Sequence, residues 1–234
     1  TNTSVYSNYS QGLAMLMGDL VRMTDDGQTM FEWAWQELHD ADAPEHRLRR
    51  LAALRKVMAE HTWKKRLEMI AGRLLGCGFG KSADVVVLSQ ADSQTDLENL
   101  LAMIRGQNLP VRLAIPARAD LDVPDEVQVL DEKQCALSPD QLFAGSWVAL
   151  WHPADCYGAF YLSDMVAAAG FGQGDVIGKA CYWTAGESGE HWVGDDLEYR
   201  IVDSLAWRRS VAPASRWDRS IAGLLAMIDE GAFT

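Results

Sequence analysis

The sequence predicts an α/β fold, a mainly parallel sheet with flanking helices, preceded by an all-helical segment. Short apolar runs at 84–89, 111–115, 127–130 and 147–151 have the composition of buried parallel strands. Before Gly76, apolar residues instead recur every three or four positions, which is the helical period. A stretch of helical period also follows the run at 147–151 and leads into another apolar run, as in a crossover between parallel strands.

The segment before Gly76 is predicted to be almost entirely helical. Pro44 suits the first turn of a helix, because its missing N–H is not needed there. Thr62 can cap the last helix by accepting a hydrogen bond from a backbone N–H of its first turn. The glycine-rich stretch that follows breaks any helix, so we expect two domains, 1–78 and 79–234. The helices are expected at 13–21, 29–39, 45–60 and after Thr62.

The second domain begins with the strand at 84–89, the most uniformly apolar and β-branched run in the chain. A helix opens at 92–95, and two further strands follow before the run at 147–151. The remaining elements are expected in this order: a helix over 160–169, a strand over 175–182, paired strands at 197–203 and 207–211, and an amphipathic helix over 217–230.

A strand, a helix and a second strand at the start of a domain are typical of nucleotide-binding α/β folds. Neither GxGxxG nor GxxxxGK[ST] occurs in the sequence, so the dinucleotide and P-loop classes lose support. Ligands of such sheets bind beyond the carboxyl ends of the strands. Asp155 falls at such a place, after the run at 147–151.

The charge of the chain is distributed unevenly. Its formal net charge is −12, which argues against nucleic acid as a partner. However, ten of the 21 Lys and Arg residues, but only three of the 33 acidic ones, lie between residues 45 and 81. This basic segment could contact an anionic membrane surface peripherally, dock on the acidic remainder of the chain, or form a solvated helix face.

The four cysteines are far apart and form no CxxC pair, which argues against a zinc ribbon and a disulfide scaffold. The sequence contains no secretion signal and no apolar run of about 20 residues, the length that a membrane span requires. We therefore expect a soluble cytoplasmic protein with reduced thiols. The chain begins with Thr1 rather than Met, so we expect it to be a piece of a longer protein.

The stretch VALWHPADCYGAFYLSDMVAAA, followed by DVIGKACYW, resembles the core of bacterial family 2 glycosyltransferases with the GT-A fold. The resemblance implies a GT-A-like sheet and sugar transfer from a nucleotide sugar to a glycan acceptor in bacterial surface-polysaccharide synthesis. In that family, an acidic DxD element holds a divalent cation against the sugar-nucleotide diphosphate. The matching positions here run from His152 to Asp155, and Asp155 is their only carboxylate.

The resemblance also implies roles for residues outside the DxD element. The end of the first strand holds the base and ribose in that family, which here implies Ser89 and Asp92 as nucleotide-binding residues. The catalytic base for the acceptor hydroxyl belongs to a later acidic loop, for which we favour Asp195 and Asp196. Two further carboxylates of the same loop are alternatives: Glu187 and Glu190.

Ligand chemistry completes the expected metal site. Asp155, with His152 or His191, could hold Mn²⁺ or Mg²⁺ between phosphate oxygens. Lys179 could meet a phosphate as a fixed positive charge. If this site has lost its function with its carboxylates, the alternative is a non-catalytic module derived from a GT-A domain, with a structural or assembly role. A hydrolase that uses Asp155 and His152 is a third alternative, without a supporting nucleophile motif.

A second resemblance lies in the helical segment. The stretch VMAEHTWKKRLEMIAGRLL resembles the C-terminal helical tail of GT-B glycosyltransferases related to spore-maturation enzymes. This resemblance implies that a transferase module precedes the segment in a longer chain. The alternative is an ordinary helical subdomain.

Overall fold

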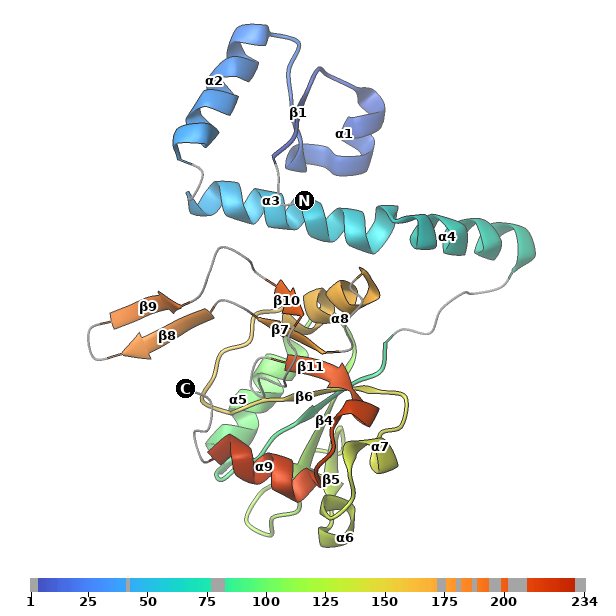
Figure 1. Cartoon of the computed structure of the whole chain (residues 1–234), viewed down its shortest axis with the longest axis vertical. Coiled ribbons are helices and arrows are strands. Elements are labelled where there is room, and N and C mark those ends of the chain that lie inside the picture. The colour runs from blue at the N-terminus through green and yellow to red at the C-terminus, as the bar shows by residue number, and fades with distance from the viewer. Residues whose placement is uncertain are drawn as a thin grey trace. The chain divides into compact units, whose positions relative to one another are not determined.

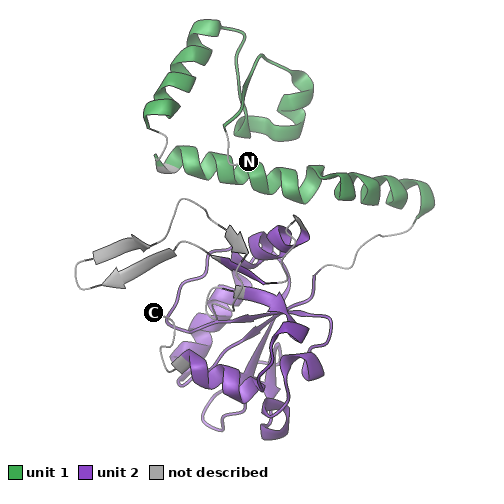
Figure 2. Cartoon of the chain, viewed as in Figure 1, with its two compact units in different colours: residues 1–80 green, residues 81–234 purple. Residues whose placement is uncertain are grey.

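The computed structural model consists of two compact units, residues 1–80 and 81–234 (Figure 2). The domain boundary predicted after residue 78 lies outside the described residues. The structure describes residues 4–40, 43–76, 83–171, 176–179, 182–186, 189–193, 199–201 and 210–229.

Unit 1 contains four α-helices among its described residues (Figure 1). Pro44 is the first residue of the third helix, and the Thr62 side chain accepts a hydrogen bond from the backbone N–H of Lys65, so both predicted helix starts are confirmed. The elements are β1 (Tyr6–Ser7), α1 (Gln11–Met17), the 3₁₀ turn η1 (Gly18–Leu20), β2 (Arg22–Met23), α2 (Gly27–His39), α3 (Pro44–Lys56), the π-helical turn η2 (Val57–His61) and α4 (Trp63–Leu75).

The prediction of an all-helical first segment is wrong at β1 and β2. These two short strands pair in parallel, with Tyr6 opposite Arg22 and Ser7 opposite Met23. The helix expected over 13–21 ends early because Gly18 adopts a φ of +56°, a conformation that glycine tolerates and a continuing helix does not. The chain beyond Val21 is therefore extended and can pair with β1.

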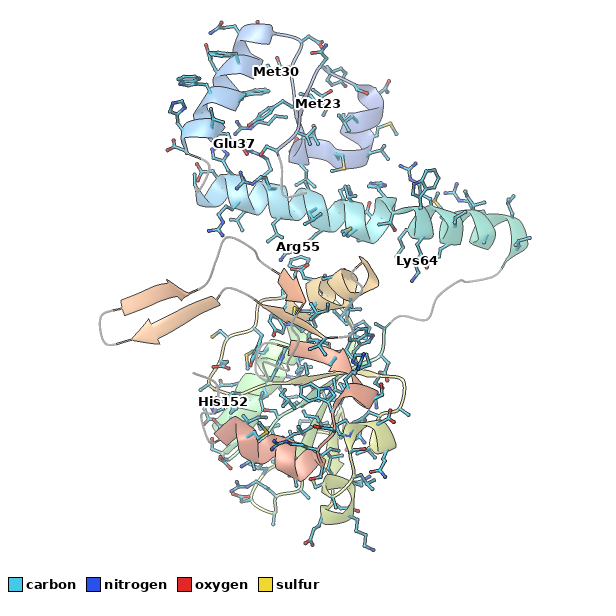
Figure 3. The ribbon with its side chains drawn as sticks, in the orientation of Figure 1. Met23, Met30, Glu37, Arg55, Lys64 and His152 are labelled. Carbon is cyan, nitrogen blue, oxygen red and sulfur yellow. The ribbon has the colours of Figure 1, made fainter. Side chains whose placement is uncertain are left out.

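Unit 1 is held together by a buried carboxylate, that of Glu37 on α2 (Figure 3). Two guanidinium groups of α3 bind it, so part of the basic segment is neutralised inside this unit. Burial, together with the bond to Glu37, raises the pKa of Tyr6 to about 12. The groups around the Glu37 carboxylate are the hydroxyls of Ser4 and Tyr6, Arg49 Nη2 at 2.9 Å, Arg50 Nη1 at 3.4 Å and His46 Nδ1 at 3.6 Å.

Unit 2 is built on a seven-stranded sheet with the order β10-β7-β11-β6-β3-β4-β5. The four strands β6, β3, β4 and β5 are mutually parallel, whereas β11 runs antiparallel to β6 and β7, and β10 antiparallel to β7. The strand bounds are β3 (Val85–Leu88), β4 (Val111–Pro116), β5 (Val127–Leu130), β6 (Trp147–Leu150), β7 (Ile177–Lys179), β10 (Tyr199–Ile201) and β11 (Ser210–Pro213). A separate hairpin consists of β8 (Tyr182–Gly186) and β9 (Gly189–Val193).

Helices cover both faces of this sheet, which confirms the α/β class. Alternate side chains of the strands face either α5 (Gln94–Arg105) and α8 (Tyr161–Phe171), or α9 (Ile221–Asp229) on the other face. The predicted apolar face of the last helix is buried through Ile221, Leu224, Leu225 and Ile228. The described residues of the unit also contain three short helices: α6 (Glu132–Cys135), α7 (Pro139–Leu142) and the 3₁₀ turn η4 (Ala214–Arg216).

The four strands predicted to share one parallel sheet do so, but the later pairing is different from the predicted one. The strands expected at 197–203 and 207–211 do not pair with each other, because β7 lies between β10 and β11. Val211 and Ala212 of β11 are fully buried, and they contribute to opposite faces of the sheet. A strand that is apolar on both faces belongs in the sheet interior, which explains why β11 inserts between β6 and β7.

At the amino ends of the central strands, a polar clip joins three of them. The Asp84 carboxylate, before β3, accepts hydrogen bonds from Arg112 of β4 at 3.1 and 2.5 Å, and from the Ser146 hydroxyl, before β6, at 2.6 Å. The Asp84 carbonyl also accepts from the N–H of Trp147 at 2.8 Å. Arg112, and then Ser146, hold the pKa of Asp84 below its ordinary value.

We expect Glu37→Gln to destabilise unit 1 by about 3 kcal/mol, because it leaves two partly buried guanidinium groups without their carboxylate. Hydrogen exchange measured by mass spectrometry on peptides of α2 and α3 reports this loss separately from unit 2. Glu32→Gln on the exposed part of α2 is the matched control, with an expected change within about 0.5 kcal/mol. Equal exchange in the two variants would show that the cluster does not stabilise the unit.

Asp84→Asn is expected to lower the stability of unit 2 at neutral pH by about 0.5–1 kcal/mol, since the ion pair is half exposed. A lowered folded-state pKa stabilises above the unfolded value of about 3.9, and this contribution disappears as pH falls through the folded pKa. Urea unfolding should therefore show a deficit that shrinks on acidification. Asp125→Asn, in an exposed loop, should show no such pH-dependent deficit; a deficit of Asp84→Asn that persists in acid would contradict the clip.

Candidate functional site

The candidate site lies where the order of the parallel strands reverses. From β3 the chain moves outward to β4 and β5, and then returns to the other side of β3 at β6. The loops after β3 and β6 therefore leave neighbouring strands at the carboxyl edge, and they lead to α5 and α8 on the same face of the sheet. In open α/β sheets this reversal leaves a crevice in which ligands bind.

Ser89 connects the ends of three strands at this edge. Its hydroxyl donates to the carbonyl of Trp151 at 2.8 Å, and its N–H donates to the carbonyl of Ala114 at 3.2 Å. The N–H of Trp151 donates in turn to the carbonyl of Leu88 at 3.0 Å. Ser89 is fully buried, and its hydroxyl fixes the starts of the two loops rather than facing solvent.

The loop after β6 is held by hydrogen bonds within itself. The Tyr157 hydroxyl accepts from the N–H of His152 at 3.3 Å and donates to Asp155 Oδ2 at 3.1 Å. The N–H of Asp155 donates to the carbonyl of His152 at 3.0 Å, which closes a turn. The Asp155 carboxylate is therefore oriented by its own loop before any ligand arrives.

A cluster of three aromatic side chains, Trp151, Tyr157 and Tyr161, packs against this loop. The Tyr157 ring stacks on Trp151 with centroids 4.2 Å apart and an interplanar angle of 2°. Tyr161 meets Tyr157 edge-on at 5.1 Å. Burial, the neighbouring Tyr161 and the Asp155 carboxylate raise the pKa of Tyr157 well above its ordinary value. The hydroxyl therefore remains a donor to Asp155 over the physiological pH range.

The geometry of His152 (labelled in Figure 3) does not suit a metal ligand. Its Nδ1 accepts a hydrogen bond from the N–H of Ala154 at 3.1 Å, so the neutral ring carries its proton on Nε2. A metal-bound histidine needs one bare nitrogen for the ion and usually donates from the other. No group of three or more His, Cys, Asp or Glu side chains within the described part of the chain is arranged to hold a metal ion.

Asp155 fits a different kind of metal binding. Mg²⁺ commonly keeps several waters and binds through one or two carboxylates together with substrate phosphates. The Asp155 carboxylate accepts a hydrogen bond from Tyr157, and its residue is only half buried, so part of it is accessible to solvent. It can therefore contribute to an ion that arrives with a diphosphate, whereas His152 cannot do so without losing its bond to Ala154.

Arg118 is a charged residue of this edge that sequence reasoning did not select. It follows β4, and its guanidinium binds Asp92 at 2.6 Å and Asp120 at 3.1 Å. Asp120, and then Asp92, raise the pKa of Arg118, and Arg118 lowers that of Asp120. Asp92, expected to bind nucleotide, is thus joined to the loop after β4. Its position shortly after the strand predicted at 111–115 was the feature of the sequence that could have identified Arg118 as a residue of this edge.

The remaining predicted site residues are described less completely. Lys179 is the last residue of β7, which is parallel to β6, so it lies at the carboxyl edge with β11 between the two strands. His191 lies in β9, opposite Thr184 in the separate hairpin. Asp195 and Asp196, as well as the alternative Glu187, lie outside the described residues.

The chain was compared with models of protein families and with curated proteins, and neither comparison gave a match.

We expect Ser89→Ala to destabilise unit 2 by about 1–3 kcal/mol, because it leaves the buried carbonyl of Trp151 without its donor. Denaturant unfolding followed by circular dichroism measures the change. Ser163→Ala, which removes a hydroxyl from an exposed hydrogen bond on α8, is the control, with an expected effect within about 0.5 kcal/mol. An effect of Ser89→Ala as small as that of the control would show that the loops are fixed by other contacts.

Proposed function

We propose that unit 2 binds a nucleotide sugar at the carboxyl edge of β3 and β6 and belongs to the glycosyltransferases with a GT-A-like fold. The observation that carries the proposal is the reversal of strand order between β3 and β6, with both flanking loops joined by Ser89. The sequence resemblance to family 2 glycosyltransferases adds the donor class. The acceptor would be a glycan of a bacterial surface polysaccharide or glycoconjugate.

The charges at this edge support a requirement for a divalent cation. The loops after β3, β4 and β6 contain the carboxylates of Asp92, Asp120 and Asp155 and one guanidinium, that of Arg118, which binds Asp92 and Asp120. A diphosphate is itself anionic, so it would be repelled by this excess unless a cation comes with it. When bound, Mn²⁺ or Mg²⁺ would neutralise charge on the leaving diphosphate, and Asp155 is the residue that we propose to hold it.

Other residues are proposed for the phosphate, for the catalytic base and for the orientation of Asp155. Lys179 at the end of β7 would meet a phosphate from the far side of β11. The base that takes the proton of the acceptor hydroxyl is proposed among Asp195 and Asp196. Tyr157 is a positioning residue, because it acts through the orientation of Asp155.

A non-catalytic module is the second candidate, and one observation favours it. Among the residues of the loop after β6 that match the metal-binding element, only Asp155 is a carboxylate, and the imidazole of His152 is already used by the N–H of Ala154. A domain that had kept its scaffold and lost its ligands would look the same at this loop. Binding of a sugar nucleotide separates the two candidates.

Calorimetry with UDP-, GDP- and CDP-sugars, with and without Mn²⁺, tests the proposal. We expect weak binding that requires Mn²⁺ and that Asp155→Asn weakens by at least about tenfold, because the variant removes the charge that holds the ion. Glu98→Gln on the exposed face of α5 is the control and should bind as the parent does. His191→Ala should weaken binding less than Asp155→Asn.

Two results would contradict the proposal. Absence of binding at about millimolar sugar nucleotide with metal present, an affinity below that of ordinary substrates, would favour the non-catalytic module. Unchanged binding by Asp155→Asn would place the nucleotide site elsewhere in the chain.

A further inference from the structure

α4 carries a narrow apolar stripe that unit 1 leaves exposed. Trp63, Leu67, Ile70 and Leu74 keep 81%, 62%, 48% and 77% of their surfaces accessible. At 3.6 residues per turn these four side chains fall within an arc of about 60°. Most amphipathic helices bury such a stripe against a core, and this one is not buried.

Cations border the stripe on both sides. On the same helical projection Lys64 lies next to one border, and Arg66 and Arg73 lie next to the other. These side chains are exposed, and Lys64 can be followed on α4 in Figure 3. The opposite face carries Lys65, which pairs with Glu68 at 3.0 Å. The stripe is thus enclosed by positive charge, while the charge on the far side is neutralised.

This arrangement matches a helix that lies in a membrane interface. Leu and Ile enter the boundary of the acyl chains, Trp is favoured at the level of the headgroups, and flanking Lys and Arg extend to anionic lipid. The 13 residues of α4 span about 20 Å, less than the hydrocarbon core of about 30 Å. None of the helices in the described ranges has the length and apolar composition of a membrane span.

We propose that α4 binds the surface of an anionic membrane, with Trp63, Leu67, Ile70 and Leu74 inserted and Lys64, Arg66 and Arg73 at the lipid headgroups. Charge selects this occupant. An anionic surface attracts the cations at the borders of the stripe. The same surface repels the chain outside residues 45–81, which has 30 acidic residues and only 11 basic ones, so α4 is the part of the chain that it attracts. A protein surface that covers the stripe is the competing occupant, and the experiment below distinguishes the two.

The test is co-sedimentation of the full chain with vesicles of phosphatidylcholine alone, or of phosphatidylcholine with about 30 mol% phosphatidylglycerol, which gives an anionic surface. We expect binding to the anionic vesicles only, and weaker binding as salt is added. Leu74→Glu should reduce the bound fraction on the order of tenfold. Leu38→Glu is the matched control, because Leu38 on α2 is 76% exposed, and it should bind as the parent does.

A charge variant tests the second half of the proposal without altering the stripe. Lys64→Glu should weaken binding by at least about fivefold, since each cation near an anionic surface contributes on that scale. Lys133→Glu, at an exposed position of α6, makes the same change of charge elsewhere and should have little effect. Lys64→Glu also remains informative if Leu74→Glu disturbs folding.

Three results would overturn the proposal. They are equal binding to neutral and anionic vesicles, binding that neither α4 variant reduces, and no binding at all. If absence of vesicle binding is accompanied by lower stability or a changed sedimentation coefficient in Leu74→Glu, a protein surface covers the stripe instead. None of these measurements involves a sugar nucleotide, so the outcome is independent of the function proposed for unit 2.

Discussion

Unit 2 depends on the joining of β3, β4 and β6 at both of their ends. Asp84 binds Arg112 and Ser146 at the amino edge, and Ser89 binds Trp151 and Ala114 at the carboxyl edge. Between these two sets of hydrogen bonds the strands are apolar on both faces. Such a sheet accepts polar side chains only at the ends of its strands, here called its amino and carboxyl edges. Polar groups are therefore concentrated at the two edges, and one of these edges is also where the strand order reverses. The same requirement that stabilises the sheet thus places the candidate site.

The loop after β6 shows how packing orients a carboxylate at that edge. Trp151 is fully buried, and its ring provides the surface on which Tyr157 stacks. The stack fixes the Tyr157 hydroxyl, and the hydroxyl orients Asp155. Truncating the Tyr157 ring would therefore disturb both the packing against Trp151 and the orientation of the Asp155 carboxylate. Removing only the Tyr157 hydroxyl would separate the two effects. Electrostatic preorganisation of this kind requires no reorganisation at the moment of ligand binding.

The sequence predicted the parts of the fold that depend on local apolar patterns. β3 to β6 and the buried face of α9 follow from runs and periods that each segment carries within itself. The place of β11 could not be predicted in this way, because it depends on which distant strands offer two free edges. Asp155 was found because it follows a strand. The hydrogen bond from the Ala154 N–H to His152 Nδ1 could not be predicted, because it depends on the detailed backbone geometry of the loop. Arg118 was missed because its partner Asp92 belongs to a different loop.

The count of charges in residues 45–81 does not distinguish cations that are paired within unit 1 from cations that are exposed. The basic segment includes two kinds of cation that differ in surroundings: those of α3 that bind the buried Glu37, and those of α4 that border an exposed apolar stripe. The first kind shares one desolvated carboxylate within unit 1, which cancels one of its two positive charges. The second kind remains in water, where attraction to an anionic partner is strong at low salt and screened at high salt. The net charge of the segment therefore overstates the charge that α3 presents to an anionic partner, whereas Lys64, Arg66 and Arg73 of α4 are exposed.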